Sequence, residues 1–85
     1  MYYVYVIADE EGKTYTGYTG DLEKRLKKHN SGTENYTKGR KWRYVYYEAY
    51  LDKADAVLRE RRLKSHGQGM RQLKERIKNS LQVKE

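Results

Sequence analysis

The chain has 85 residues, no cysteine and a formal net charge of +7, which arises from nineteen basic and twelve acidic side chains. The absence of cysteine excludes disulfides and thiolate metal sites, and no apolar run approaches the roughly 20 residues that cross a bilayer. The N-terminus also lacks the pattern of a signal peptide. We therefore expect a single domain over residues 1–85 that resides in the cytoplasm.

The positive charge is unevenly distributed. Residues 24–64 hold thirteen basic side chains against five acidic ones, whereas residues 1–23 hold one against five. Such a concentration is typical of a protein with a polyanionic partner, most simply nucleic acid. The alternative is a lysine-rich helix surface that is merely solvated. An anionic membrane is disfavoured as a partner, since no basic helix of the chain has a broad aromatic face.

Hydrophobic periodicity and turn residues predict six elements. In chain order they are strands at residues 2–8 and 14–18, a helix that ends at Asn30, a strand at 42–51, a helix from Asp52 to about Lys64, and a helix at about 70–81. This β-β-α-β-α-α order predicts an α+β fold with a three-stranded sheet, antiparallel or mixed, that needs helices packed on it. The first strand is apolar on both faces, which is typical of a central strand.

The first two strands form a predicted hairpin, with Gly12 in its turn. If the register pairs Ile7 with Tyr15, then Tyr5 lies opposite Gly17 on the neighbouring strand. The glycine would leave open space beside the Tyr5 ring. The sequence alone leaves this register open.

The first helix places two polar side chains beside its apolar stripe. Leu22 and Leu26 share one face, and Arg25 and His29 lie just next to them on a helical wheel. Both polar residues are therefore expected at the border of the buried surface rather than on the solvent side.

Five short motifs follow one another along these elements: Tyr3-Val4-Tyr5, Tyr15-Thr16-Gly17 after nine intervening residues, Asp21-Leu22, Arg25-x-x-x-His29, and Ala56-Val57-Leu58-Arg59-Glu60. Together they resemble the GIY-YIG nuclease family, over a core of about residues 2–64, and most of all its small standalone bacterial members. The chain departs from the family pattern at Tyr3, where the family has glycine, and at Val4 and Thr16, which replace isoleucines. The helix at about 70–81 lies outside the core pattern.

The resemblance implies a catalytic site of Tyr5, Tyr15, Arg25, His29 and Glu60 around one divalent ion, Mg²⁺ or Mn²⁺. Tyr5 would accept or relay the proton of the attacking water, for which a phenol with a pKa of about 10 needs nearby positive charge. Arg25 would hold two phosphate oxygens. Tyr15 would hydrogen-bond a phosphate oxygen or the water, and His29 would position the water or protonate the leaving oxygen.

Glu60 is the candidate metal ligand. On the wheel it lies between Ala56 and Val57, where a carboxylate needs a cation partner. A single carboxylate suits Mg²⁺, which keeps several waters and takes other ligands from substrate phosphate. Structural explanations stay open for each residue: core or sheet packing for the tyrosines, solvation for Arg25, helix capping for His29, and an ion pair between Glu60 and a neighbouring arginine.

The loop before the third strand and the first residues of that strand carry the candidate nucleic-acid contacts. Their basic and aromatic residues are expected to bind phosphates and to stack on an unpaired base: Lys38, Arg40, Lys41 and Arg43, with Tyr36 and Trp42 among them. No helix-turn-helix, zinc-finger or RNA-binding signature is present, so sequence-specific reading is not expected. His66 has no second histidine or cysteine nearby and is not expected to bind a metal.

These features favour a metal-dependent endonuclease that acts on DNA and selects a structure, such as a branch, flap or damaged site in DNA repair, or is targeted by a protein partner. The alternative is a nucleic-acid-binding module with the nuclease fold but little catalysis. Tyr5 and Glu60 separate the two hypotheses, because binding alone requires neither. A basic protein–protein adaptor would need an exposed apolar patch that the sequence does not indicate. RNA stays open as the substrate.

Overall fold

The computed structural model describes residues 1–65 and 67–83, so the expectation about His66 lies outside the described residues. These residues form three strands and four helices. In chain order they are β1 (Tyr2–Ala8), β2 (Thr14–Thr19), α1 (Leu22–Asn30), β3 (Arg43–Tyr50), α2 (Lys53–Lys64), α3 (Gln68–Arg76) and α4 (Lys78–Gln82). No helix among them is long and apolar enough to cross a membrane.

The three strands form one sheet in the order β2-β1-β3, and both neighbouring pairs are antiparallel. The prediction of an α+β fold with a three-stranded sheet is confirmed, as is the central place of β1. Residues Val4 to Ala8 are buried without interruption, because both faces of this strand are covered.

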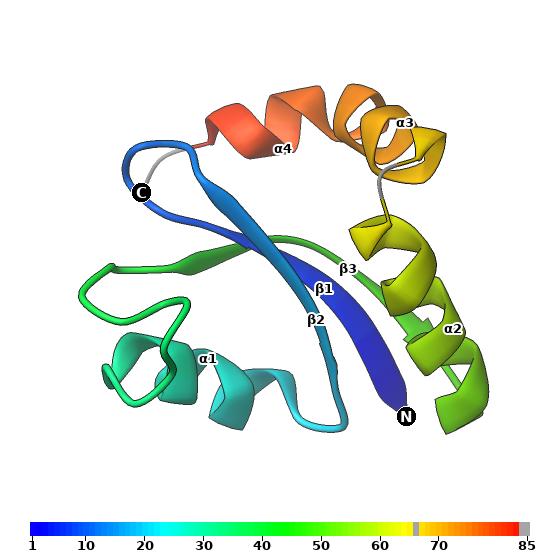
Figure 1. Ribbon diagram of the computed structural model, residues 1–85, viewed down its shortest axis with the longest axis horizontal. Helices are drawn as coiled ribbons and strands as arrows, with labels where there is room; N and C mark the ends of the chain where they lie inside the picture. Colours follow the sequence, from blue (N-terminus) through cyan, green and yellow to red (C-terminus); the bar gives the residue numbers. More distant parts are fainter. Residues whose placement is uncertain (66, 84–85) are drawn as a thin grey trace.

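Alternation along β1 divides the interior into two parts. Val4 and Val6 face α2, α3 and α4, whereas Tyr5 and Ile7 face α1 and the loop at residues 31–42. Figure 1 shows these two sets of elements on opposite sides of the sheet. The sheet is therefore the middle layer, and the phenol of Tyr5 lies on the side that α1 covers.

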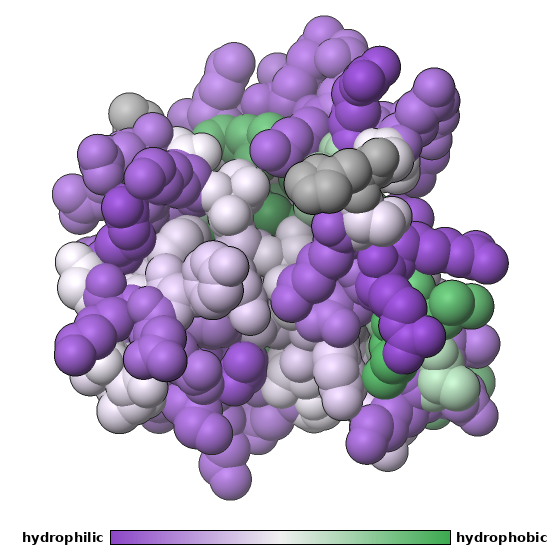
Figure 2. Space-filling view, viewed as in Figure 1, coloured by the Kyte–Doolittle hydropathy of each residue, from purple (hydrophilic) through white to green (hydrophobic). Residues whose placement is uncertain are grey.

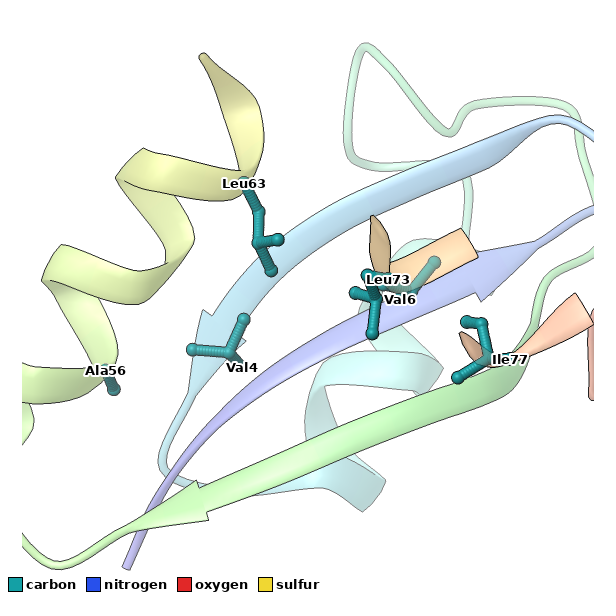
Figure 3. Close-up of a cluster of buried hydrophobic side chains, with 6 residues drawn as sticks. All are labelled: Val4, Val6, Ala56, Leu63, Leu73 and Ile77. Atoms are coloured by element: carbon teal, nitrogen blue, oxygen red, sulfur yellow. The ribbon is translucent and has the colours of Figure 1, made fainter. Parts of the chain in front are cut away.

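The first part of the interior is an aliphatic core (Figure 3). Its buried members are Val4, Val6, Ala56, Leu63, Leu73 and Ile77. Full burial of side chains as large as valine and leucine contributes about 1.5–3 kcal/mol each, which makes this cluster the main support of the sheet. The apolar stripe predicted for residues 70–81 packs here as expected, but the single helix predicted there is wrong. The chain leaves regular helical geometry at Ile77, with φ −106° and ψ 22°, and continues as α4.

Two aspartates set where α1 and α2 begin. The Asp21 carboxylate accepts a hydrogen bond from the backbone N–H of Lys24 at 3.0 Å, and Asp52 caps α2 in the same way. At its other end α1 finishes at Asn30 with Ser31 as its C-cap, and Gly32 takes a φ of 81° that favours glycine. Only two residues separate β2 from α1, and the α1 side chains Leu22 and Leu26 pack on the hairpin.

The loop at residues 31–42 is closed at its base by the side chain of Asn30. Its Oδ1 accepts from the backbone N–H of Trp42 at 2.7 Å, and its Nδ2 donates to the carbonyl oxygen of Trp42 at 3.1 Å. The indole N–H of Trp42 donates to the carbonyl oxygen of Thr37 at 3.0 Å. These bonds hold the loop against α1 and the β1 face that carries Tyr5.

Candidate active site

In the β1–β2 register Tyr5 lies opposite Gly17 and Ile7 lies opposite Tyr15. This is the register that the sequence analysis considered for the hairpin. The phenol of Tyr5 extends over Gly17. A Cβ at this position would lie 2.7 Å from Cζ of Tyr5, so any larger residue would displace the ring. Glycine is required here by close packing, and the Tyr5 side chain is fully buried.

Tyr5 and His29 form a buried polar pair. The Tyr5 hydroxyl lies 2.7 Å from Nε2 of His29, and Nδ1 of His29 lies 3.1 Å from the hydroxyl of Thr37. His29 and Thr37 are 1% and 0% exposed, so both ring nitrogens have their partners inside the protein. Both ring nitrogens of His29 are thus engaged by Tyr5 and Thr37, and the contacts that lead from His29 towards Arg25 and the surface run through the Tyr5 hydroxyl.

Arg25 links this pair to the surface. Its Nε donates to the Tyr5 hydroxyl at 3.1 Å, and its terminal nitrogen donates to the Glu34 carboxylate at 3.0 Å. Burial raises the pKa of the Tyr5 phenol, and the hydrogen bond and charge of Arg25 oppose this only in part. Burial, together with the charge of Arg25, lowers the pKa of the His29 imidazole. At neutral pH the pair is therefore a protonated phenol beside a neutral imidazole.

Glu60 approaches the same region from α2. Its charge is one of the influences that raise the pKa of Tyr5, and its side chain is 19% exposed. Its ion-pair partner is Lys64, at 3.3 Å, rather than one of the neighbouring arginines, and Arg59 instead contacts Glu48 on β3. The Lys64 ammonium also lies 4.9 Å from the centre of the Tyr15 ring.

The five residues that the sequence analysis singled out thus come together at the β1–β2 hairpin, from β1, β2, α1 and α2. The family model of the GIY-YIG catalytic domain matches residues 1–79. This chain belongs to the GIY-YIG family. The membership that the motifs indicated is confirmed, and it indicates a nuclease-type function.

Relatives of this GIY-YIG protein bear the name UPF0213, which does not state an activity. One from Staphylococcus saprophyticus is 41% identical over 66 residues, 75% of this chain and 80% of the relative. One from Clostridium perfringens is 44% identical over 62 residues, 71% of this chain and 67% of the relative. The solution NMR structure of a UPF0213 protein from Bacillus halodurans has 38% identity and a TM-score of 0.53, and covers 93% of this chain and 84% of that one.

The basic loop of this GIY-YIG domain differs from the expected contact surface. Trp42 is 6% exposed and packs with Tyr5, so its ring is a core element and is not available for stacking on a base. Arg40 pairs with the buried carboxylate of Asp9, and Arg43 donates to backbone carbonyls. Lys38 and Lys41 are exposed and remain as candidate phosphate contacts. Hydrophilic side chains cover most of the face in Figure 2.

Three contacts of the GIY-YIG site were missed by sequence reasoning. Thr37 supports the His29 ring, Glu34 holds Arg25, and Lys64 pairs with Glu60. The last could have been found, because residues four apart on a helix are neighbours. Nothing in the polar, aperiodic loop distinguishes Thr37 or Glu34 from the residues around them, since their partners depend on how the loop folds back over α1.

Proposed function

We propose that this GIY-YIG domain is a metal-dependent endonuclease that hydrolyses DNA phosphodiester bonds. The observation that carries the proposal is the chain of contacts from Thr37 through His29 to the hydroxyl of Tyr5, with Arg25 on the same hydroxyl. A nucleic-acid-binding surface needs no buried phenol–imidazole pair. Activation of a water molecule can use such a pair, because the proton that the water loses must have an acceptor.

In the proposed mechanism, the proton of the attacking water moves towards the protein interior, from the water to Tyr5 and from Tyr5 to His29. In this proposal the Tyr5 hydroxyl donates to Nε2 of the neutral His29 ring, and the Nδ1–H of His29 donates to Thr37. The Tyr5 hydroxyl is buried beside Arg25, so in this proposal Arg25 moves onto the phosphate and opens the hydroxyl to the water. As a water oxygen bonds to phosphorus, Tyr5 takes the water's proton and passes its own to His29. The bond from phosphorus to the leaving oxygen breaks, and solvent protonates that oxygen. The proton bound to His29 then returns to solvent through Tyr5.

Arg25 is suited to the phosphate. Its side chain is 26% exposed, and its fork holds the Tyr5 hydroxyl on one side and the Glu34 carboxylate on the other. A phosphate oxygen presents to a guanidinium the same charge as a carboxylate oxygen. Arg25 can therefore exchange Glu34 for a non-bridging phosphate oxygen and stabilise the charge that develops during hydrolysis.

The donor set fits one ion that takes most of its ligands from water and substrate. Glu60 supplies one carboxylate, and the described residues contain no group of three or more His, Cys, Asp and Glu side chains placed to hold a metal. Mg²⁺ is commonly held by one or two carboxylates together with waters and phosphate oxygens, and Mn²⁺ accepts the same ligands. When bound, such an ion supplies charge relief to the phosphoryl oxygens.

The substrate we propose is DNA with a structural feature such as a branch, flap or damaged site, rather than a particular sequence. The net charge of +7 supports a polyanionic substrate, and the exposed Lys38 and Lys41 support contacts to its backbone. The sequence carries no helix-turn-helix, zinc-finger or RNA-binding signature, so targeting by a protein partner in the cytoplasm is part of the proposal.

A second candidate function is binding without catalysis. The two ion pairs Arg25–Glu34 and Lys64–Glu60 favour it, because they occupy the groups that hydrolysis would use. The discriminating experiment incubates the protein with supercoiled plasmid, branched DNA and single strands, in Mg²⁺, Mn²⁺ or EDTA.

Two variants test the site, each with a matched control. We expect Tyr5→Phe and Glu60→Gln to lower metal-dependent cutting by about 100-fold or more, whereas Tyr47→Phe and Glu75→Gln, at exposed positions, leave it unchanged. Cutting that survives the first two substitutions would overturn the assignment of the site. Binding without metal-dependent cutting on every substrate would favour the second candidate function.

A further inference from the structure

A groove of about 640 Å³ begins at Tyr15 and lies between the β2 edge, the loop at residues 31–42 and the junction of α2 and α3. Side chains of three kinds line it: the aromatic Tyr15 and Tyr36, the apolar Leu63 and Met70, and the basic Lys64 and Lys74. Figure 2 shows this face hollowed between the sheet edge and the C-terminal helices, with hydrophobic residues at the bottom. A volume of this size is typical of small-molecule and nucleotide pockets.

Tyr36 offers the free aromatic surface of this groove. It is 85% exposed, and its ring lies 6.0 Å from that of Tyr15 at an angle of 39°. The Tyr15 ring is already occupied, by the His29 ring at 5.2 Å and by the Lys64 ammonium at 4.9 Å. The next residue, Thr37, is fully buried and hydrogen-bonded, so the chain that carries Tyr36 is anchored although its side chain is exposed.

The charges of the groove match a phosphate. Lys64 lies at the end that adjoins Glu60 and Tyr15, and Lys74 projects from α3 into the same groove. Between them Leu63 and Met70 give an apolar floor. A planar aromatic wall, an apolar floor and two ammonium groups suit a ligand that is flat and apolar at one end and anionic at the other, which is the chemistry of a nucleotide.

We propose that this groove binds an unpaired nucleotide that flanks the cleaved phosphodiester, with its base against Tyr36 and its phosphate near Lys64 and Lys74. A base inside a duplex is stacked on both neighbours and cannot reach a side groove unless it is extruded. The substrate class is thus nucleic acid with at least one unpaired nucleotide beside the cut, as in a single strand, flap or bulge. This inference rests on the proposed nuclease function, since it takes the position of the cut from that site.

The test measures binding in EDTA, so that cutting plays no part. Oligonucleotides that carry 2-aminopurine are titrated with the wild-type protein and with Tyr36→Ala, Tyr36→Phe and Tyr47→Ala. Tyr47 is a matched control, because it is another exposed tyrosine, 56% accessible, on β3. We expect Tyr36→Ala to weaken binding of single strands and flaps by about 5- to 150-fold and to abolish quenching of 2-aminopurine, since stacking on an aromatic side chain is worth that much per base.

Tyr36→Phe should retain the affinity and the quenching, and Tyr47→Ala should change binding less than about twofold. Fully paired duplex should bind wild type and Tyr36→Ala equally. Equal losses for Tyr36→Ala and Tyr47→Ala, equal losses on duplex and single strand, or no binding of single strands would each overturn the proposal. The result is independent of catalysis: a protein that stacks the base but never cuts refutes the nuclease function alone, and one that cuts without stacking refutes this groove alone.

Discussion

Thr37→Val tests whether the Thr37 hydroxyl holds the His29 ring in place. Valine nearly matches threonine in shape but leaves Nδ1 of His29 without its partner at 3.1 Å, whichever of the two groups donates. Because Thr37 and His29 are 0% and 1% exposed, water cannot replace the lost bond without a rearrangement. An unsatisfied buried polar group costs about 1–3 kcal/mol of unfolding free energy. For a domain of this size that lowers the melting temperature by about 4–24 °C.

The assay is thermal and urea denaturation of Thr37→Val beside Thr33→Val. Thr33 lies in the same loop, but its hydroxyl bonds to Ser31 at the surface, so the control should change stability by less than about 0.5 kcal/mol. Nitrogen-15 NMR of the His29 ring would report its tautomer, which we expect to carry the proton on Nδ1 in the wild type. Cutting should fall in Thr37→Val at temperatures where it is fully folded. Equal stability of the two variants would refute the reasoning.

Two further predictions concern Gly17 and Lys64. Gly17→Ala should destabilise the fold by about 1–3 kcal/mol in urea denaturation and stop cutting, because the added methyl group takes the place of the Tyr5 ring; a fully active, equally stable variant would contradict this. Lys64→Met should tighten Mn²⁺ binding about two- to fivefold in EPR titrations without nucleic acid, since its ammonium lies 3.3 Å from Glu60. Lys53→Met removes the same charge from the same helix, and equal affinities of the two variants would disprove the competition.

The arrangement around β1 could be predicted because it follows from local patterns. A strand that is apolar on both faces is expected at the centre of a sheet, as β1 is. Its side chains point alternately to the two faces, so the sequence also indicates which residues share a face. Tyr5 lies opposite Gly17 in the register that pairs Ile7 with Tyr15, which the sequence allowed but did not determine. Helical periodicity likewise placed Arg25 and His29 on the border of the buried face.

The contacts made by the loop at residues 31–42 could not be predicted in this way. Trp42 looked like a stacking residue because it stands among lysines and arginines, yet the loop folds back and buries it beside Tyr5. Tyr36, six residues earlier in the same loop, is the exposed one. Which aromatic residue of an aperiodic loop turns inward depends on the bonds that close the loop, here those between Asn30 and Trp42. Such bonds join residues that are far apart in the sequence, and they produce no periodic pattern in it from which they could be predicted.

The charged groups of the site pair with one another in the free protein, and this bears on how the site can work. Arg25 is held by Glu34 and Glu60 by Lys64, so the groups that would meet a phosphate and a cation are locally neutralised although the chain carries +7 overall. Partly exposed pairs of this kind are worth about 0.2–1 kcal/mol each, little enough for a phosphodiester to displace them. In the proposed function, a phosphate on Arg25 releases Glu34, and a cation on Glu60 releases Lys64 towards the groove at Tyr36. We therefore propose that the weak Lys64–Glu60 pair links binding of the cation to binding of the flanking nucleotide.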